Sequence, residues 1–299
     1  MKISELRRNY HDRICTDIVR LKKDKSGLLY PNFANPSSRA SREIALEVLK
    51  RIKCNKRENE NGRSAISEQQ AGKIFEEITR SFIRDAFGLL NHLRPGNWIY
   101  STESITNFEQ YAHLAELERL FKELAKLEHL SKESKELASA LGLDYIIKPD
   151  IVIGRNPVPD AEINKNAALI TPQDDVVQYS PLRQRGERPK PILHASISCK
   201  WTIRSDRSQN TRTEALNLIR NRKGHTPHIA AVTAEPLPTR IASLALGTGD
   251  LDCVYHIALP ELQELIKELQ EAGQLDMLQT LINGKRLRDI SDLPFDLAI

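Results

Sequence analysis

The hydrophobic pattern of the chain changes its period near residue 144, and this change limits the folds that the chain can adopt. Before it, from 67 to 93, apolar residues recur at three- and four-residue spacing, which is typical of an amphipathic helix. That stripe consists of Phe75, Ile78, Phe82 and Ala86. After it, short β-branched runs alternate with helical stretches, at 144–154, 192–199, 228–234 and 251–259. We therefore expect one α/β domain with a mixed sheet and an N-terminal helical layer.

The remaining segments have compositions that predict helices and loops. In residues 1–60 we expect helices broken by a turn-rich loop from 30 to 41. The stretch from 155 to 191 is rich in Pro, Asn and Gln and should be largely loop. Further helices are expected at 108–141, at 213–222 after a charged loop, and at 260–273 between Pro260 and Gly273.

Positive charge is concentrated in two parts of the chain. The net charge is only +4, from 44 Lys and Arg against 40 Asp and Glu. From Met1 to Arg57, however, 15 basic residues stand against 6 acidic ones, and from Lys200 to Lys223 the numbers are 7 and 2. Local excesses of this kind suit a polyanion such as nucleic acid. Solvated surface faces are the alternative explanation.

Four cysteines lie far apart along the chain, at Cys15, Cys54, Cys199 and Cys253. They form no CxxC pair and no zinc-type spacing, which predicts free thiols in a reducing cytoplasm rather than a disulfide or metal framework. The first residues lack the apolar core of a signal peptide, and no apolar run approaches membrane-spanning length. We therefore expect a soluble cytoplasmic protein.

Several catalytic motifs are absent from the sequence. The chain has no GxxxxGK(S/T) phosphate loop, no GxGxxG after a strand, no HExxH and no GxSxG. His225 and His228 are three residues apart, but Pro227 between them would break a helix. These histidines are expected to be loop residues rather than a metal-binding pair.

An acid, a strand and a lysine remain as candidate catalytic groups. Asp150 stands at the start of one apolar strand, and Lys200 ends another. Because residues two apart on a strand share a face, Ser198 should point the same way as Lys200. A carboxylate that holds Mg²⁺ and a lysine that acts on the attacking water are the groups needed for metal-dependent phosphodiester cleavage. On these residues alone, the alternative is that Asp150 caps a turn and Lys200 is a surface charge.

The usual nuclease signature of this kind is PD…(D/E)xK, with an acid two residues before the lysine. Here Ser198 occupies that place, so one metal ligand of the pattern is missing. The candidate replacement is Glu214, which follows Lys200 on the next expected helix. This replacement requires the chain to fold back, so that the helix brings Glu214 to the end of the strand.

A wider set of residues resembles a known enzyme family. The pattern K-x3-R-x-DR-x6-E is similar to that of the CCGG-cutting type II restriction endonucleases, and is formed by Lys200, Arg204, Asp206, Arg207 and Glu214. Within this family the chain most resembles the NgoMIV branch. The resemblance includes PDIVIGRN, DAEIN, LHASISCKWTIRSDR, LNLIRNRKG, PHIAAVTAEP, ALGTGDLDCVYH, NGKRLRDISDLP and RPGNW. It runs from about Gln69 to the C-terminus and is weakest before residue 60 and at 115–140.

The resemblance implies a restriction-endonuclease-like PD-(D/E)xK fold, with a mixed central sheet flanked by helices in a single domain over 1–299. A helical part at 1–60 would carry a DNA-contacting loop at 31–39, and the catalytic sheet core would span 144–259. The family's cofactor is Mg²⁺, with two ions per active site. By similarity, these ions would be held by Asp150, Glu214 and the main-chain carbonyl of Cys199.

The same resemblance implies roles for the other catalytic residues. Lys200 would act on the water nucleophile, and Ser198 would hydrogen-bond near the metal. Glu76 matches a further acid near the metals of the family, and its alternative is an exposed helix charge beside Glu77. The products would carry a 5′-phosphate and a 3′-hydroxyl.

The charged stretch after Lys200 would read the inner bases of the target. Arg204 and Arg207 suit the O6 and N7 atoms of guanine, and Asp206 can accept from the N4 amino group of cytosine. Solvated loop charges are the alternative, but they do not explain an aspartate where it would repel phosphates.

The flanking base pair would be contacted by Arg240 and Gln69, which match family positions with that role. They favour the site GCCGGC, cut after the first G to leave four-nucleotide 5′ overhangs. The loop from 32 to 39 departs from the family, because Asn35-Pro36-Ser37 stands where an aspartate and a serine would be expected.

The resemblance also implies partners. Close family members are homotetramers, that is, dimers of dimers on double-stranded DNA, and a methyltransferase must protect the host's own sites. Two alternatives stay open. One is a repair or junction nuclease of the same fold, which would not need the Arg204–Arg207 reader. The other is a DNA-binding protein that has lost cleavage, against which Asp150, Lys200 and Glu214 argue.

Overall fold

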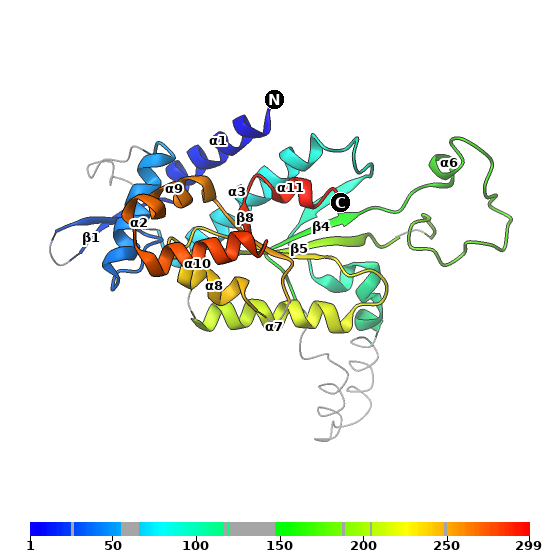
Figure 1. The fold of residues 1–299 in the computed structure, drawn as a ribbon. Helices are drawn as coiled ribbons and strands as arrows, with labels where there is room; N and C mark the ends of the chain where they lie inside the picture. Colours follow the sequence, from blue (N-terminus) through cyan, green and yellow to red (C-terminus); the bar gives the residue numbers. More distant parts are fainter. Residues whose placement is uncertain are drawn as a thin grey trace, which may run out of the picture. The chain divides into compact units, whose positions relative to one another are not determined.

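The computed structural model describes residues 1–24, 27–54, 66–116, 119, 147–186, 189–203, 205–247 and 250–299. In this part of the chain a six-stranded sheet has the order β3-β4-β5-β6-β7-β8, and a separate hairpin pairs β1 with β2 (Figure 1). The chain divides into two compact units. Unit 1 holds 1–94, 197–213 and 229–299, and unit 2 holds 95–196 and 214–228. Strand β5 (Ile192–Lys200) runs from unit 2 into unit 1.

Parallel strands form the sheet of unit 1. Strand β6 (His228–Thr233) pairs in parallel with β7 (Cys253–His256), which pairs in parallel with β8 (Leu287–Asp289). Parallel neighbours need crossover connections, and helices supply them. These helices are α8 (Pro238–Ala245) between β6 and β7, and α9 (Leu259–Leu269) and α10 (Ala272–Asn283) between β7 and β8. Helix α11 (Leu293–Asp296) follows the last strand.

The N-terminal part of unit 1 is helical, as expected. It comprises α1 (Ile3–Arg13), the π-helical turn η1 (Ile14–Ile18), β1 (Leu21–Lys23), β2 (Leu29–Pro31), α2 (Arg39–Arg51) and α3 (Glu68–Gly88). Helix α3 starts where Ser67 accepts a hydrogen bond from the Gln70 amide at 3.1 Å. The apolar stripe that predicted this helix is buried. Tyr10 of α1 packs on it, with its ring 5.1 Å from that of Phe82.

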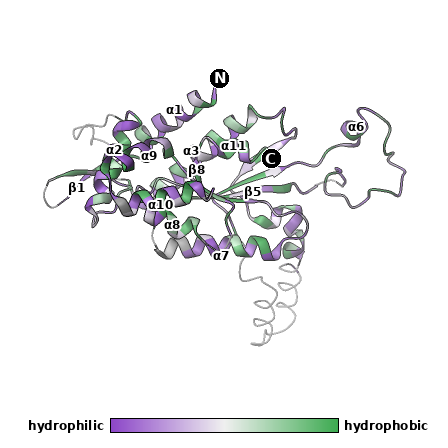
Figure 2. Ribbon diagram, in the orientation of Figure 1, coloured by the Kyte–Doolittle hydropathy of each residue, from purple (hydrophilic) through white to green (hydrophobic). Residues whose placement is uncertain are grey.

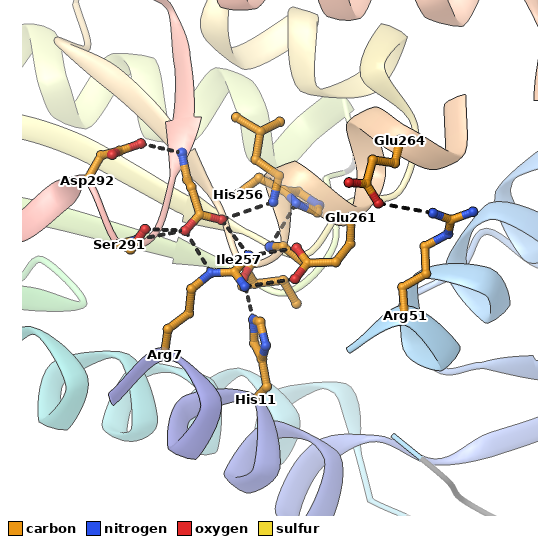
Figure 3. A network of polar contacts seen from close by, with 12 residues as sticks. Arg7, His11, Arg51, His256, Ile257, Glu261, Glu264, Ser291 and Asp292 are labelled. Atoms are coloured by element: carbon orange, nitrogen blue, oxygen red, sulfur yellow. Dashed lines mark hydrogen bonds and ion pairs between the residues drawn. The ribbon is translucent and has the colours of Figure 1, made fainter. Parts of the chain in front are cut away.

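A partly buried ion network joins α1 to the C-terminal part of unit 1 (Figure 3). The Arg7 guanidinium donates to both carboxylate oxygens of Glu261 at 2.8 and 2.6 Å, and to those of Asp289 at 2.8 and 2.9 Å. Burial alone would lower the pKa of Arg7, but its hydrogen bonds to these two carboxylates, and their negative charge, raise the pKa above its ordinary value. One turn further, His11 Nε2 lies 2.7 Å from the Ile257 carbonyl oxygen.

Unit 2 is built around antiparallel strands. Strand β3 (Trp98–Ser101) pairs with β4 (Ile151–Arg155), and β5 follows in the strand order. Short helical turns accompany them: η3 (Ile105–Asn107), η4 (Glu109–Tyr111) and α6 (Asp160–Ile163). Helix α7 (Ser205–Asn221) belongs to unit 2 from Glu214 onward. Hydrophilic and hydrophobic residues alternate along it, as expected for a helix with one buried face (Figure 2).

Several local predictions were wrong in their boundaries. Helix α7 begins at Ser205 rather than near 213, so the charged stretch before 213 is mostly helical. Helix α9 ends at Leu269, because Gln270 adopts a left-handed φ of 51°, and Gly273 lies inside α10. The β1–β2 hairpin and strands β3 and β8 were not predicted. In the predicted strand at 144–154, the described residues before β4 form no strand, and most of the helix expected at 108–141 lies outside the described residues.

The prediction of four free thiols was wrong for two of them. Cys15, in η1, forms a disulfide with Cys54, just after α2. The two residues are 39 positions apart, and only the folded arrangement of η1 and α2 brings them together. Cys199 and Cys253 are free and buried, as expected.

Candidate active site and DNA-reading residues

Two of the predicted catalytic carboxylates lie in unit 2. Asp150 immediately precedes β4 and is partly buried, next to the buried Pro149. Glu214 lies on α7 and is also partly buried. The Ile151–Ile153 segment is fully buried, which fixes the strand at whose start Asp150 stands. Both groups therefore offer carboxylate oxygens from ordered elements of unit 2.

The predicted lysine, Lys200, is the last residue of β5, in the C-terminal part of that strand, which belongs to unit 1. Ser198 and Cys199 are buried, with 8% and 6% of their surfaces exposed, and Lys200 is partly buried. Because strand side chains alternate, Ser198 and Lys200 share one face, and Cys199 occupies the other. The Cys199 thiol is thus part of the strand packing, as expected.

Trp201, the residue after Lys200, belongs to an aromatic cluster that was not predicted from the sequence. Trp201 is buried, and its ring lies 5.2 Å from the ring of Phe33 and 5.2 Å from that of Phe75. Phe33 belongs to the loop expected to contact DNA, and Phe75 directly precedes Glu76. Such edge and tilted ring contacts restrain orientation as well as burying area. Trp201 therefore links the end of β5 to that loop and to α3.

Helix α3 carries two of the predicted residues. Gln69 is in its first turn and exposed, and Glu76 is partly buried. Seven residues make almost two full turns, so Gln69 and Glu76 lie on the same side of the helix. Because Glu76 is partly buried, it is not the exposed helix charge of the alternative interpretation.

The loop at 32–39 is held by its own polar side chains. Asn32 accepts from the Arg20 amide at 3.2 Å and donates to the Ile18 carbonyl at 3.1 Å. Asn35 accepts from the Ser37 amide at 3.1 Å, forming an Asx turn at the point where the chain departs from the family. These contacts fix the loop without the expected aspartate.

The residues predicted to read the inner bases are described only in part. Arg204 lies outside the described residues, and of Asp206 and Arg207 the structure describes the backbone alone. Both are in the first turn of α7, not in a loop as predicted. An acidic residue in this turn is favourable for a helix, because the amide groups there carry partial positive charge.

A buried acid, Glu235, contacts two of the segments of unit 1 that are predicted to read DNA. It is fully buried just after β6, and its Oε2 accepts from the Ile203 amide at 3.1 Å. The same oxygen lies 3.5 Å from Nη1 of Arg240, whose side chain is 34% exposed. Burial raises the pKa of Glu235 to about 6, although the Ile203 amide and Arg240 act in the opposite direction. Sequence reasoning missed Glu235, since only its position behind a buried strand distinguishes it.

The described residues contain no group of three or more His, Cys, Asp and Glu side chains placed to hold a metal. The predicted ligand set needs only two carboxylates and a carbonyl, which are the oxygen donors that Mg²⁺ prefers. His225 is exposed outside helices and strands, as expected of a loop residue, whereas His228 begins β6 with its ring 5.0 Å from that of His194, so the expectation of a loop residue is wrong for His228. In the described part of the chain, no helix is both long and apolar enough to cross a membrane.

Comparison with known proteins identifies the family. The model of the NgoMIV restriction enzyme family matches residues 10–299. The type II restriction enzyme NgoMIV of Neisseria gonorrhoeae is 50% identical over 237 residues, covering 77% of this chain and 78% of that protein. The resemblance and the mixed α/β fold predicted from the sequence are thereby confirmed. The chain belongs to the NgoMIV restriction enzyme family.

Proposed function

We propose that this type II restriction endonuclease of the NgoMIV family cuts both strands of GCCGGC after the first G, in a reaction that requires Mg²⁺. One observation carries the proposal. Strand β5 ends at Lys200, and helix α7, with Asp206 and Arg207 in its first turn, begins at Ser205. A catalytic lysine and an inner-base reader on one short segment would keep cleavage and recognition in register.

The proposed catalytic residues are Asp150, Glu214, Lys200, Ser198 and Glu76. The two carboxylates Asp150 and Glu214, with the Cys199 carbonyl, are oxygen donors suited to Mg²⁺. When bound, Mg²⁺ supplies positive charge that stabilises the phosphate undergoing attack. Lys200 would orient the attacking water and help to remove its proton, with Ser198 on the same face of β5.

Recognition of the four inner base pairs would fall to Arg204, Asp206 and Arg207. Arginine bonds bidentately to guanine, and aspartate accepts from cytosine, so the three side chains suffice for CCGG. Gln69 and Arg240 would read the outer pair, together with the 32–39 loop. What supports these roles is the family match and the packing of Trp201 between the loop and α3.

We further propose a homotetramer acting on double-stranded DNA in the cytoplasm, with a methyltransferase as the companion activity. A palindromic target favours two-fold symmetry. The segment between β4 and β5 also leaves large apolar side chains exposed, which is typical of an assembly surface: Leu169, Val176, Val177, Tyr179 and Leu182. The domain boundaries stay a proposal of one restriction endonuclease domain over 1–299, because β5 belongs to both compact units.

The proposal is tested by digesting a plasmid with two GCCGGC sites in the presence of Mg²⁺ and sequencing the ends. We expect uniform four-nucleotide 5′ CCGG overhangs carrying 5′-phosphates. Lys200→Ala should keep specific binding to GCCGGC and lose cutting. Lys165→Ala, a change at an exposed lysine, should cut like the wild type.

Three outcomes would contradict parts of the proposal. Normal cutting by Lys200→Ala would remove that lysine from catalysis. Ends at CCGG sites with another flanking base would show that the enzyme recognises a different outer base pair. Tight CCGG binding without cutting by the wild type would favour a DNA-binding protein that has lost cleavage.

A further inference from the structure

Glu235 is a fully buried carboxylate of unit 1 that has no role in the proposed reaction. A buried carboxylate is costly unless charge and hydrogen bonds compensate it. Here compensation comes from three directions. The Ile203 amide donates to Oε2 at 3.1 Å, the Leu237 amide donates to Oε1 at 3.4 Å, and Arg240 Nη1 lies 3.5 Å from Oε2.

These partners lie on two different recognition segments. Ile203 is three residues past Lys200 and directly precedes Arg204, the first inner reader. Arg240 is on α8 and is proposed to read the outer pair. One oxygen atom, Glu235 Oε2, therefore contacts both the approach to the inner reader and the outer reader itself.

A free arginine side chain samples many rotamers, and fixing it costs conformational entropy. An ion pair to a buried, immobile carboxylate reduces that cost before DNA arrives. Since 34% of the Arg240 side chain stays exposed, it can still reach a base. Without its partner, Arg240 could turn to a phosphate, and a phosphate contact carries no direct sequence information.

We propose that Glu235 is a positioning residue for sequence recognition, which holds Arg240 toward the outer base pair and ties it to the segment of the inner reader through the Ile203 amide. This inference rests on the proposed reading roles of Arg240 and of the Arg204–Arg207 segment. A carboxylate that only caps its own turn would contact Leu237 and need no arginine.

The test measures kcat/KM on three duplexes, namely GCCGGC, the outer-substituted ACCGGT and the inner-substituted GCATGC. The enzymes are the wild type, Glu235→Gln, Arg240→Ala and the double variant. Glutamine keeps one oxygen for the Ile203 amide and removes the charge that holds Arg240, while its NH2 group replaces the oxygen that accepts the longer hydrogen bond from the Leu237 amide. Glu264→Gln, at an exposed glutamate on α9, is the matched control.

We expect Glu235→Gln to lose about tenfold in discrimination against ACCGGT, the size of one base contact, and to keep its discrimination against GCATGC. Because Glu235 acts through Arg240, the double variant should match Arg240→Ala alone rather than add to it. Glu264→Gln should behave like the wild type on all three duplexes.

The remaining outcomes each overturn a defined statement. If Arg240→Ala relaxes the outer pair and Glu235→Gln does not, the positioning role is wrong while the proposed function stands. If Glu235→Gln slows all three duplexes equally and adds to Arg240→Ala, Glu235 has a structural role alone. If Arg240→Ala leaves outer discrimination intact, the reading role of Arg240 falls, and the positioning role with it.

Folding is checked by circular dichroism and thermal midpoint. Should Glu235→Gln not fold, Glu235→Asp takes its place, since it keeps the charge and withdraws it from Arg240 by one methylene. Its outer discrimination should then lie between those of the wild type and Arg240→Ala. Wild-type outer discrimination in a folded Glu235→Asp would overturn the positioning role.

Discussion

Gly154 is a residue whose identity is set by the space around it. It lies in β4, and a Cβ atom there would stand 2.7 Å from the Phe108 ring and 2.8 Å from the Ile99 side chain. Phe108 is completely buried and has little room to move. We expect Gly154→Ala to lower the free energy of unfolding by about 1–3 kcal/mol, because it overpacks this contact.

A second glycine provides the control. A Cβ at Gly72, inside α3, would meet no atom within 4 Å. Gly72→Ala should therefore raise the free energy of unfolding by about 0.5–1 kcal/mol through better helix propensity. Urea denaturation measures the free energy of unfolding of both variants. An unchanged midpoint for Gly154→Ala would mean that the Phe108 and Ile99 side chains move to make room for the added methyl group.

Among single residues, the sequence predicted those whose role follows from their immediate neighbours in the chain. Asp150 and Lys200 stand at strand ends, which a β-branched run marks by itself. Trp201 and Glu235 carry no such mark, because their roles come from partners far along the chain. Trp201 meets Phe33 and Phe75, and Glu235 is 32 residues from Ile203.

At the scale of elements, two ion pairs of Arg7 join α1 to α9 and β8. Arg7→Met keeps most of the aliphatic stem but leaves Glu261 and Asp289 without their cation. Since these side chains are at most 19% exposed, we expect a loss of about 3 kcal/mol in the free energy of unfolding. Arg8→Met, at the exposed neighbour on α1, should change it by less than about 0.5 kcal/mol. Similar losses in both variants, measured in urea, would exclude the network as the cause.

Elements were predictable where their periodicity is strong. Strands β4, β6 and β7 have β-branched apolar runs, and α3 has a continuous stripe, so all were predicted. Strand β8 has three residues and β3 has four, and neither lies within a longer apolar run of the kind that marks the equally short β7. The Cys15–Cys54 disulfide was missed for a related reason, since spacing in the sequence does not report which elements will pack together.

For the whole molecule, buried titratable groups make stability depend on pH. Burial lowers the pKa of His256 from 6.5 to about 4, so the unfolded chain takes up this proton first and stability falls as pH drops from 6.5 to about 4. Asp289 and Glu261 act with the same sign. Burial would raise their pKa values, but the Arg7 hydrogen bonds lower them, and their contribution is lost as pH falls through the lowered values. Glu235, with its raised pKa, opposes this trend between about 6 and 4.5.

His256→Asn isolates the histidine contribution, because its side-chain oxygen can still accept from the Ala258 amide, as His256 Nδ1 does at 3.1 Å. Between about pH 7 and about pH 5, the wild type should lose about 2 kcal/mol more than this variant. The exposed His225→Asn should follow the wild type. Parallel pH profiles for the wild type and His256→Asn, from urea unfolding, would show that His256 is not the group responsible.

The path of the chain through the two units has a consequence for how such genes can change. The chain crosses between units after residues 94, 196, 213 and 228, and two of these crossings fall inside β5 and α7. Neither unit is encoded by one continuous stretch of DNA. Recombination between related genes therefore cannot exchange a whole unit in a single event. A unit in such a gene can change only through several shorter exchanges or through substitutions at individual codons.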